Sequence, residues 1–136
     1  MTKESATPDP VELVRKQVEA LDRGDLDGVM SSVAEDGVLD GRADRLEGRA
    51  AIRGFLVEWF MAYEELHFEL VEVSHLGGGV VFAVVAQDGR LVGGDGRLRQ
   101  REGWVYLCVR GSIARLTTSA VDEARAASER LAQERA

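Results

Sequence analysis

Three side chains in this sequence are of the types most often used as metal ligands, general bases or nucleophiles: His67, His75 and Cys108. The histidines stand eight residues apart in a stretch that predicts one strand. At about 3.3 Å per residue they share a face but lie more than about 20 Å apart. Because they cannot share a metal ion and no third ligand stands at metal-binding spacing, the sequence predicts no metal site and no cofactor. Each histidine is more typical of a solvated strand position than of a general base.

Cys108 lies in an apolar run, residues 104–109, that predicts the interior of a strand. A free cysteine there is more typical of a small core residue than of a nucleophile, and a single cysteine excludes an internal disulfide. Trp59 and Tyr63, four residues apart on a predicted helix, could instead line a pocket for a flat apolar ligand. The alternative is a core contact between that helix and a sheet.

The composition narrows the classes of partner. Seventeen basic against 24 acidic residues give a net charge of -7, which repels nucleic acids and anionic lipid surfaces. Four arginines recur along one predicted hairpin, which is typical of a solvated face, although a partner-binding role is a weaker alternative: Arg90, Arg97, Arg99 and Arg101. The longest apolar run, residues 77–86, is too short to cross a bilayer, and the first residues lack the apolar segment of a signal peptide. We therefore expect no nucleic-acid or membrane partner and a cytoplasmic location.

The elements that would position these residues begin with two helices. The length predicts one domain, residues 1–136, with a frayed polar tail at residues 1–8. Asp9, followed by a proline, predicts the start of the first helix, and Gly24 predicts its left-handed end. Asp25 then caps a shorter helix that ends near residue 36.

A short strand at residues 38–40 and a polar loop at residues 41–48 lead into the clearest helix. Its apolar stripe has helical spacing and comprises Ile52, Phe55, Leu56, Trp59, Phe60 and Tyr63. Four strands follow at about residues 66–73, 80–87, 97–109 and 113–119. In the first, the alternation of apolar and polar residues shifts by one position, which indicates a bulge or bend. The second is apolar throughout, which is typical of a strand covered on both sides. A closing helix at residues 120–136, capped by Ser119, is expected to be peripheral. The sequence thus predicts an α+β fold of order α-α-β-α-β-β-β-β plus a C-terminal helix, with a curved antiparallel sheet.

This order, together with four local motifs, resembles the SnoaL-like family of the nuclear transport factor 2-like superfamily. Residues 20–27 (ALDRGDLD) resemble the family's helix-breaking turn, and residues 34–38 (AEDGV) resemble its entry into the first strand. Residues 46–55 (LEGRAAIRGF) are similar to the start of the third helix, and residues 110–116 (RGSIARL) to the final hairpin. Together the four motifs cover most of the chain, in the family's order and spacing.

The resemblance implies a cone-shaped α+β barrel that opens at one end onto an apolar pocket. It also implies a homodimer that pairs through the outer face of the sheet. It does not imply one activity, because the family includes ketosteroid isomerases, polyketide cyclases, epoxide hydrolases, dehydratases and non-catalytic members.

The isomerase chemistry needs an aspartate base after the first strand and an oxyanion hole built from a tyrosine and a protonated acid. Carried over from the motifs, the tyrosine position falls on Gln17, the base position on Gly41 and the oxyanion acid near Val105. The match therefore fails, and isomerase chemistry of this kind is disfavoured. Asp40, one place early, remains the best candidate acid–base group, because a carboxylate at the mouth of an apolar cone has a raised pKa. The two-residue period of a strand, however, points Asp40 away from the side that Gly41 occupies.

Two hypotheses follow for the interior of the cone. In the first, the protein is an enzyme or a binding protein for a small apolar molecule, with Asp40 as the catalytic candidate and five candidate ligand-binding residues: Gln17, Leu56, Trp59, Tyr63 and Val105. In the second, the protein is a non-catalytic dimeric module whose cone is filled by its own side chains. If the face of Val105 lines the cone, Trp104 and Tyr106 lie outside and suit a dimer interface.

Overall fold

The first two helices begin and end at the residues whose chemistry favours helix termini. The computed structural model describes residues 9–41 and 44–136, so the expected tail and part of the loop at residues 41–48 lie outside it. Helix α1 spans Pro10–Arg23; the side chain of Asp9 accepts a hydrogen bond from Val11 N, and Gly24 ends the helix with φ 68°. Helix α2 spans only Leu26–Met30 and is shorter than expected, because strand β1 already begins at Val33. In the described part of the chain, no helix combines the length and apolar character needed to cross a membrane.

The first strand is longer than the sequence predicted, and the polar loop after it contains a strand. Strand β1 spans Val33–Asp40, and strand β2 spans Arg45–Glu47. The two pair antiparallel, with Leu39 opposite Leu46. Because β2 is a short edge strand whose outer residues are charged, it lacks the alternation of apolar residues that reveals a strand in a sequence.

Helix α3 spans Arg49–Met61 and buries Ile52 and Leu56. It ends two residues before Tyr63, so the prediction that Trp59 and Tyr63 share this helix is wrong. Tyr63 instead opens strand β3, where it pairs with Leu91. The helical spacing of the stripe continues by chance into the strand, and the aromatic ring of Tyr63 suits either structure.

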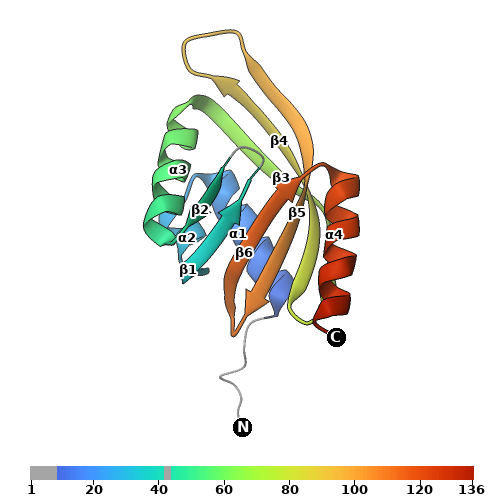
Figure 1. Ribbon diagram of the computed structural model, residues 1–136. Helices are drawn as coiled ribbons and strands as arrows, with labels where there is room; N and C mark the ends of the chain where they lie inside the picture. The colour runs from blue at the N-terminus through green and yellow to red at the C-terminus, as the bar shows by residue number, and fades with distance from the viewer. Residues whose placement is uncertain (1–8, 42–43) are drawn as a thin grey trace.

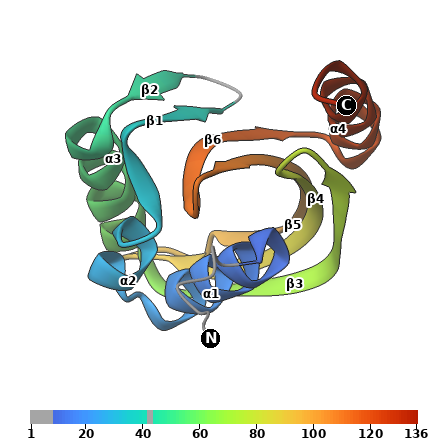
Figure 2. The same cartoon turned by 90° about the horizontal axis from the view of Figure 1, so that it is seen from below.

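The sheet has six strands in the order β2-β1-β6-β5-β4-β3. Strands β3 (Tyr63–Gly77), β4 (Val80–Leu91), β5 (Arg97–Val109) and β6 (Ser112–Ser119) form an antiparallel meander. The pairing of β1 with β6 is parallel, a crossover that the sequence did not predict. A register shift between Leu70 and Glu72 confirms the predicted bulge in β3. The sheet curls around α1, α2 and α3, as Figures 1 and 2 show.

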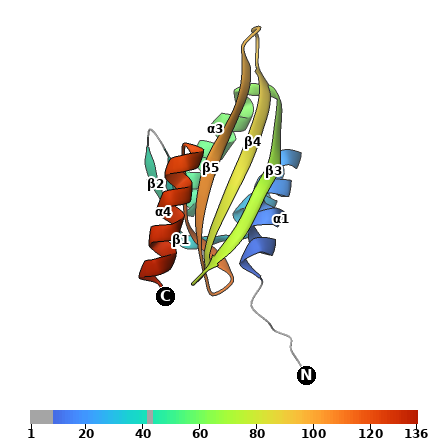
Figure 3. The ribbon, with the colours of Figure 1, turned by 90° about the vertical axis from the view of Figure 1, so that its right-hand side faces the viewer.

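Two apolar clusters lie on opposite faces of the sheet. Strand β4 contributes to both, with Val81, Ala83 and Val85 inside the curl and Val80 and Phe82 outside it. This arrangement confirms the expected strand that is covered on both sides. The cover on the outer face is helix α4, Val121–Glu134, which lies opposite α1 in Figure 3.

Helix α4 is an integral part of the fold rather than a peripheral one. Ala124 and Ser128 on this helix are fully buried, and Arg125 places its guanidinium 4.6 Å from the ring centre of Phe82. The same guanidinium forms an ion pair with Glu72 at 3.0 Å. The N-cap position is Ala120 and not Ser119, whose hydroxyl instead donates to a backbone carbonyl.

The two faces of β5 are the reverse of those predicted. Trp104 and Tyr106 belong to the inner cluster and are 3% and 0% exposed, whereas Val105 belongs to the outer cluster under α4. The predicted aromatic dimer surface therefore does not exist on this strand. Because α4 covers the outer face, both faces of β5 are apolar and the residue pattern alone does not distinguish inside from outside.

Candidate functional site

A cavity of about 250 Å³ lies inside the curl of the sheet. The described residues that line it come from all three N-terminal helices and from every strand except β3. Most of them are apolar: Leu21, Val29, Val33, Val38, Leu39, Leu46, Ile52, Phe55, Leu56, Trp59, Trp104, Ile113 and Leu116. Asp44, Phe55 and Gln100 also line the cavity and are exposed, so this end opens to solvent.

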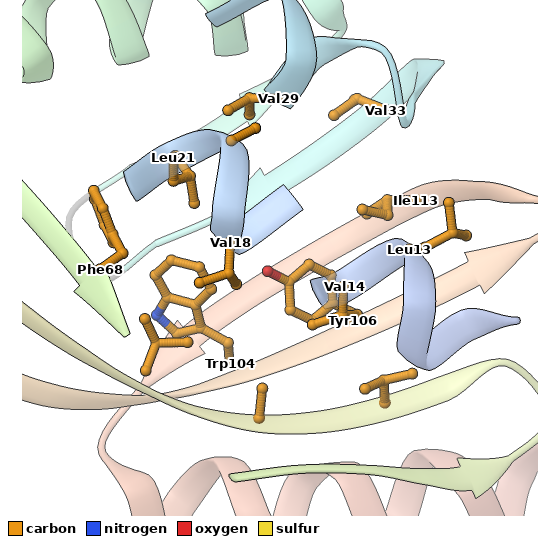
Figure 4. Packing of buried hydrophobic residues seen from close by; sticks show 14 of the residues in the cluster. Leu13, Val14, Val18, Leu21, Val29, Val33, Phe68, Trp104, Tyr106 and Ile113 are labelled. Carbon is orange, nitrogen blue, oxygen red and sulfur yellow. The ribbon is translucent and has the colours of Figure 1, made fainter. Parts of the chain in front are cut away.

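Aromatic rings form part of the cavity wall. The ring centres of Phe55 and Trp59 lie 5.8 Å apart, and those of Trp59 and Phe68 lie 5.4 Å apart in an edge-to-face arrangement. Phe68 on β3, which does not itself line the cavity, lies 6.3 Å from Trp104 between ring centres. The rings of Trp104 and Tyr106 point from the sheet toward α1, as Figure 4 shows. Edge-to-face and tilted contacts of this kind hold the rings rigid, and a rigid ring wall favours a flat apolar ligand.

A hydrogen-bonded polar cluster stands on the inner face of β4 and β5. The register places Gln87 opposite Gln100, so their side chains share this face. Gln100 Nε2 donates to Gln87 Oε1 at 2.7 Å, and Gln87 Nε2 donates to Glu102 Oε1 at 3.0 Å. Trp104 Nε1 donates to the same carboxylate oxygen at 3.2 Å. The cluster thus fixes the Glu102 carboxylate in the cavity wall.

Gln17, like Gln87, is a buried glutamine in the cavity wall, but the two differ in their hydrogen bonding. It lies on α1 and is only 4% exposed. Its Oε1 atom is buried and receives no hydrogen bond from the residues that the structure describes. Leaving a buried acceptor without a donor costs about 1 to 3 kcal/mol, so this amide does not contribute to stability as Gln87 does.

The structure places Asp40 away from the cavity. Its neighbours Leu39 and Gly41 line the cavity, but its own side chain is 37% exposed and forms an ion pair with Arg45 of β2 at 3.7 Å. Asp40 is therefore not part of the cavity lining, in accord with the two-residue period of the strand. The carboxylates that line the cavity are those of Asp44 and Glu102, neither of which was a candidate from the sequence. Glu102 could have been found from its position two residues before Trp104, once the inner face of β5 is known.

Three of the five expected ligand-binding residues line the cavity: Gln17, Leu56 and Trp59. Tyr63 and Val105 lie outside the lining. Tyr63 is displaced because α3 ends at Met61, and Val105 because it packs under α4.

The cysteine, a buried tyrosine and the two histidines lie outside the cavity lining. Burial raises the pKa of the Cys108 thiol to about 11, and burial, followed by the nearby Cys108, raises the pKa of Tyr106 well above its ordinary value. Both groups are therefore neutral at neutral pH. His67 Nδ1 lies 3.6 Å from Asp22, and His75 Nε2 accepts a hydrogen bond from Gly79 N. The described residues contain no group of three His, Cys, Asp or Glu side chains that could hold a metal ion.

Comparison with known proteins supports the same architecture. Residues 14–116 match the model of the SnoaL-like domain family. A candidate polyketide cyclase from Xanthomonas campestris pv. campestris is 24% identical, with a TM-score of 0.70, and the alignment covers 88% of this chain and 96% of that one. A candidate polyketide cyclase from Sinorhizobium meliloti is 22% identical, with a TM-score of 0.69 and coverages of 79% and 94%.

A third similar structure is a protein of ketosteroid isomerase-like fold from Catenulispora acidiphila, in complex with trimethylamine. It is 17% identical, with a TM-score of 0.73, and the alignment covers 90% of this chain and 94% of that one. At these identities the similarity establishes the fold alone. A search of curated proteins found no match.

Proposed function

Because the chain belongs to the SnoaL-like domain family, we propose that it binds a small, mainly apolar molecule in the cavity inside its cone. The observation that carries the proposal is the combination of an apolar, ring-lined wall with a few fixed polar groups. This is the usual composition of a small-molecule site, in which apolar surface gives affinity and polar groups give orientation. A cone filled by its own side chains, the alternative from the sequence, would leave no such space.

Glu102 is the residue best placed for proton transfer to or from a bound molecule. Its carboxylate stands in the cavity wall and is oriented by Gln87 and Trp104. A positioned carboxylate can act as a general base or acid in isomerase, cyclase or hydrolase chemistry. Candidate polyketide cyclases share this fold, and in our proposal Glu102 takes the role that the sequence suggested for Asp40.

The glycines of the chain allow a sharp test of binding. A Cβ atom at Gly41 would lie 3.6 Å from Asp44 O and 3.8 Å from Thr118 Oγ1, which are ordinary contacts with residues that line the cavity. A Cβ atom at Gly54, on the exposed side of α3, would meet nothing within 4 Å. Gly41→Phe should therefore narrow the cavity mouth, while Gly54→Phe makes the same chemical change in open solvent.

The assay is thermal unfolding with a panel of flat apolar ligands, since a ligand that binds only the folded state raises the unfolding temperature by mass action. The proposal predicts a ligand-dependent rise for the wild type and Gly54→Phe and a much smaller rise for Gly41→Phe. If no ligand shifts any of the three proteins, the non-catalytic alternative is preferred. If binding is seen and Glu102→Gln binds equally well, turnover assays with both proteins then separate a binding protein from an enzyme.

The homodimer implied by the family resemblance is a separate part of the proposal. Helix α4 covers the apolar part of the outer sheet face, and the uncovered part carries ion pairs such as Arg97–Asp88 and Arg90–Glu65. A second copy would therefore meet α4 and charged side chains rather than an apolar sheet. Sedimentation velocity over a range of concentrations tests the dimer, and a constant monomer mass would contradict it.

A further inference from the structure

We infer that the ligand is a one- or two-ring molecule with a single hydrogen-bonding group, such as a hydroxyl, and that the amide of Gln17 holds that group. This inference rests on the proposed function and deepens it, because it names the size class of the ligand and the residue that selects its polar end. Gln17 is thereby a specificity-determining residue.

The size of the cavity supplies the first argument. Its volume of about 250 Å³ lies below the range of roughly 300 to 1,000 Å³ that is usual for sites of drug-sized ligands. The surroundings resist expansion, since Leu21, Ile52, Leu56 and Trp104 are all buried in the main apolar cluster. Close-packed side chains of this kind do not move apart without losing their contacts. A ligand of one or two rings fits this space, whereas a rigid tetracyclic skeleton exceeds it.

The hydrogen-bond inventory of the wall supplies the second argument. On the strand side, Gln87 uses both ends of its amide, accepting from Gln100 and donating to Glu102. On the helix side, Gln17 Oε1 is buried and has no donor among the described residues. A buried amide oxygen without a donor is rare in folded proteins and calls for an explanation. A ligand hydroxyl supplies one, because it can donate its hydrogen to this oxygen.

The buried position of Gln17 makes its amide selective for the ligand. It lies among apolar neighbours on α1, such as Val14, Val18 and Leu21, where water is excluded. A site built to hydrogen-bond a ligand group rejects the analogue that lacks it more strongly than an apolar site rejects an extra methylene. The amide therefore discriminates between an alcohol and the parent hydrocarbon.

The experiment is calorimetric titration with indanol, indane and a tetracyclic steroid. It uses the full-length wild type, Gln17→Met and the matched control Gln133→Met, which makes the same change at an exposed position of α4 outside the cavity lining. Methionine keeps the length of the side chain and removes its hydrogen bonds. Circular dichroism and thermal unfolding establish that each variant is folded.

The expected result is that wild type binds indanol about tenfold more tightly than indane, in line with one net hydrogen bond, and does not bind the steroid. Gln17→Met should bind both bicyclic compounds with similar affinity, and Gln133→Met should keep the wild-type preference. The role of Gln17 is overturned if its variant retains the preference or if Gln133→Met loses it as well. The size class is overturned if the steroid binds as tightly as indanol. In those cases the cavity still binds a ligand; binding of none of the three compounds overturns the proposed function and this inference together.

Discussion

Replacing Gln17 by methionine should make the protein more stable, although the residue is almost fully buried in the core. The carbonyl oxygen of the amide is desolvated without a donor, at a cost of about 1 to 3 kcal/mol. Methionine is also unbranched and of similar length, so it loses comparable rotamer freedom on folding while placing apolar atoms among apolar neighbours. We expect Gln17→Met to raise the free energy of unfolding by about 1 to 2 kcal/mol.

The matched comparison is Gln87→Met on the opposite wall. Gln87 is 2% exposed and connects Gln100 to Glu102 through both ends of its amide. Its replacement removes one hydrogen bond to a neutral group and one to a carboxylate. We expect a loss of about 2 to 3 kcal/mol. The same substitution should thus have opposite signs at two buried glutamines of one cavity.

Urea denaturation followed by tryptophan fluorescence measures both effects. With a slope of about 2 kcal/mol per molar urea, the midpoint of Gln17→Met should rise by roughly 0.5 to 1 M and that of Gln87→Met should fall by roughly 1 to 1.5 M. The slope itself should stay constant. A fall in the free energy of unfolding of about 1 kcal/mol or more for Gln17→Met would contradict the prediction, since it would mean that the amide has a partner in the folded protein.

Three further predictions concern the scaffold. Gly54→Ala should raise the free energy of unfolding by about 1 kcal/mol, because a Cβ atom there meets no neighbour and glycine is a poor helix former; an unchanged urea midpoint would contradict this. Gly79→Ala should lower the free energy of unfolding by at least about 2 kcal/mol, because φ is +83° and the added Cβ atom would clash with the carbonyl oxygen of Cys108. A decrease of less than about 0.5 kcal/mol would contradict this turn geometry. Burial raises the pKa of the Cys108 thiol from 9.0 to about 11, so between these pH values the folded state keeps a proton that the unfolded chain loses. The contribution of Cys108 to the free energy of unfolding should therefore be constant below about pH 9 and fall as the pH rises toward about 11. Urea titrations across this range should show a smaller fall for Cys108→Val, and equal falls would place the alkaline loss elsewhere, for example at Tyr106.

The parts of the fold that were predictable from the sequence are those set by local chemistry. Asp9 and Gly24 mark the ends of α1 because a carboxylate cap and a left-handed glycine act on adjacent backbone groups. The glycine turn after β3 and the bulge at Leu70 are likewise local features. The resemblance to the SnoaL-like family then predicted the cone-shaped barrel and its apolar interior.

The candidate site was predictable only in part, because it depends on which face of each strand lies inside. Trp104 and Val105 are both suited to a core, and only the packing of α4 on the outer face decides between them. Asp40 was the candidate from the sequence because it adjoins the motif position, yet its side chain is partly exposed and forms an ion pair with Arg45. Glu102 adjoins no motif position and was therefore missed. The missing partner of Gln17 depends on the surroundings in three dimensions, which no spacing along the chain reveals.

Indanol binding inside the cone is tested most directly by the backbone and side-chain amide chemical shifts of the labelled protein. Saturable shifts are expected at the cavity lining, with the largest at the side-chain amide of Gln17 and the indole N–H of Trp104. The outer face around α4 should not respond. Shifts confined to α4 and the outer strand face, or no saturable shifts at all, would contradict a small-molecule site inside the cone.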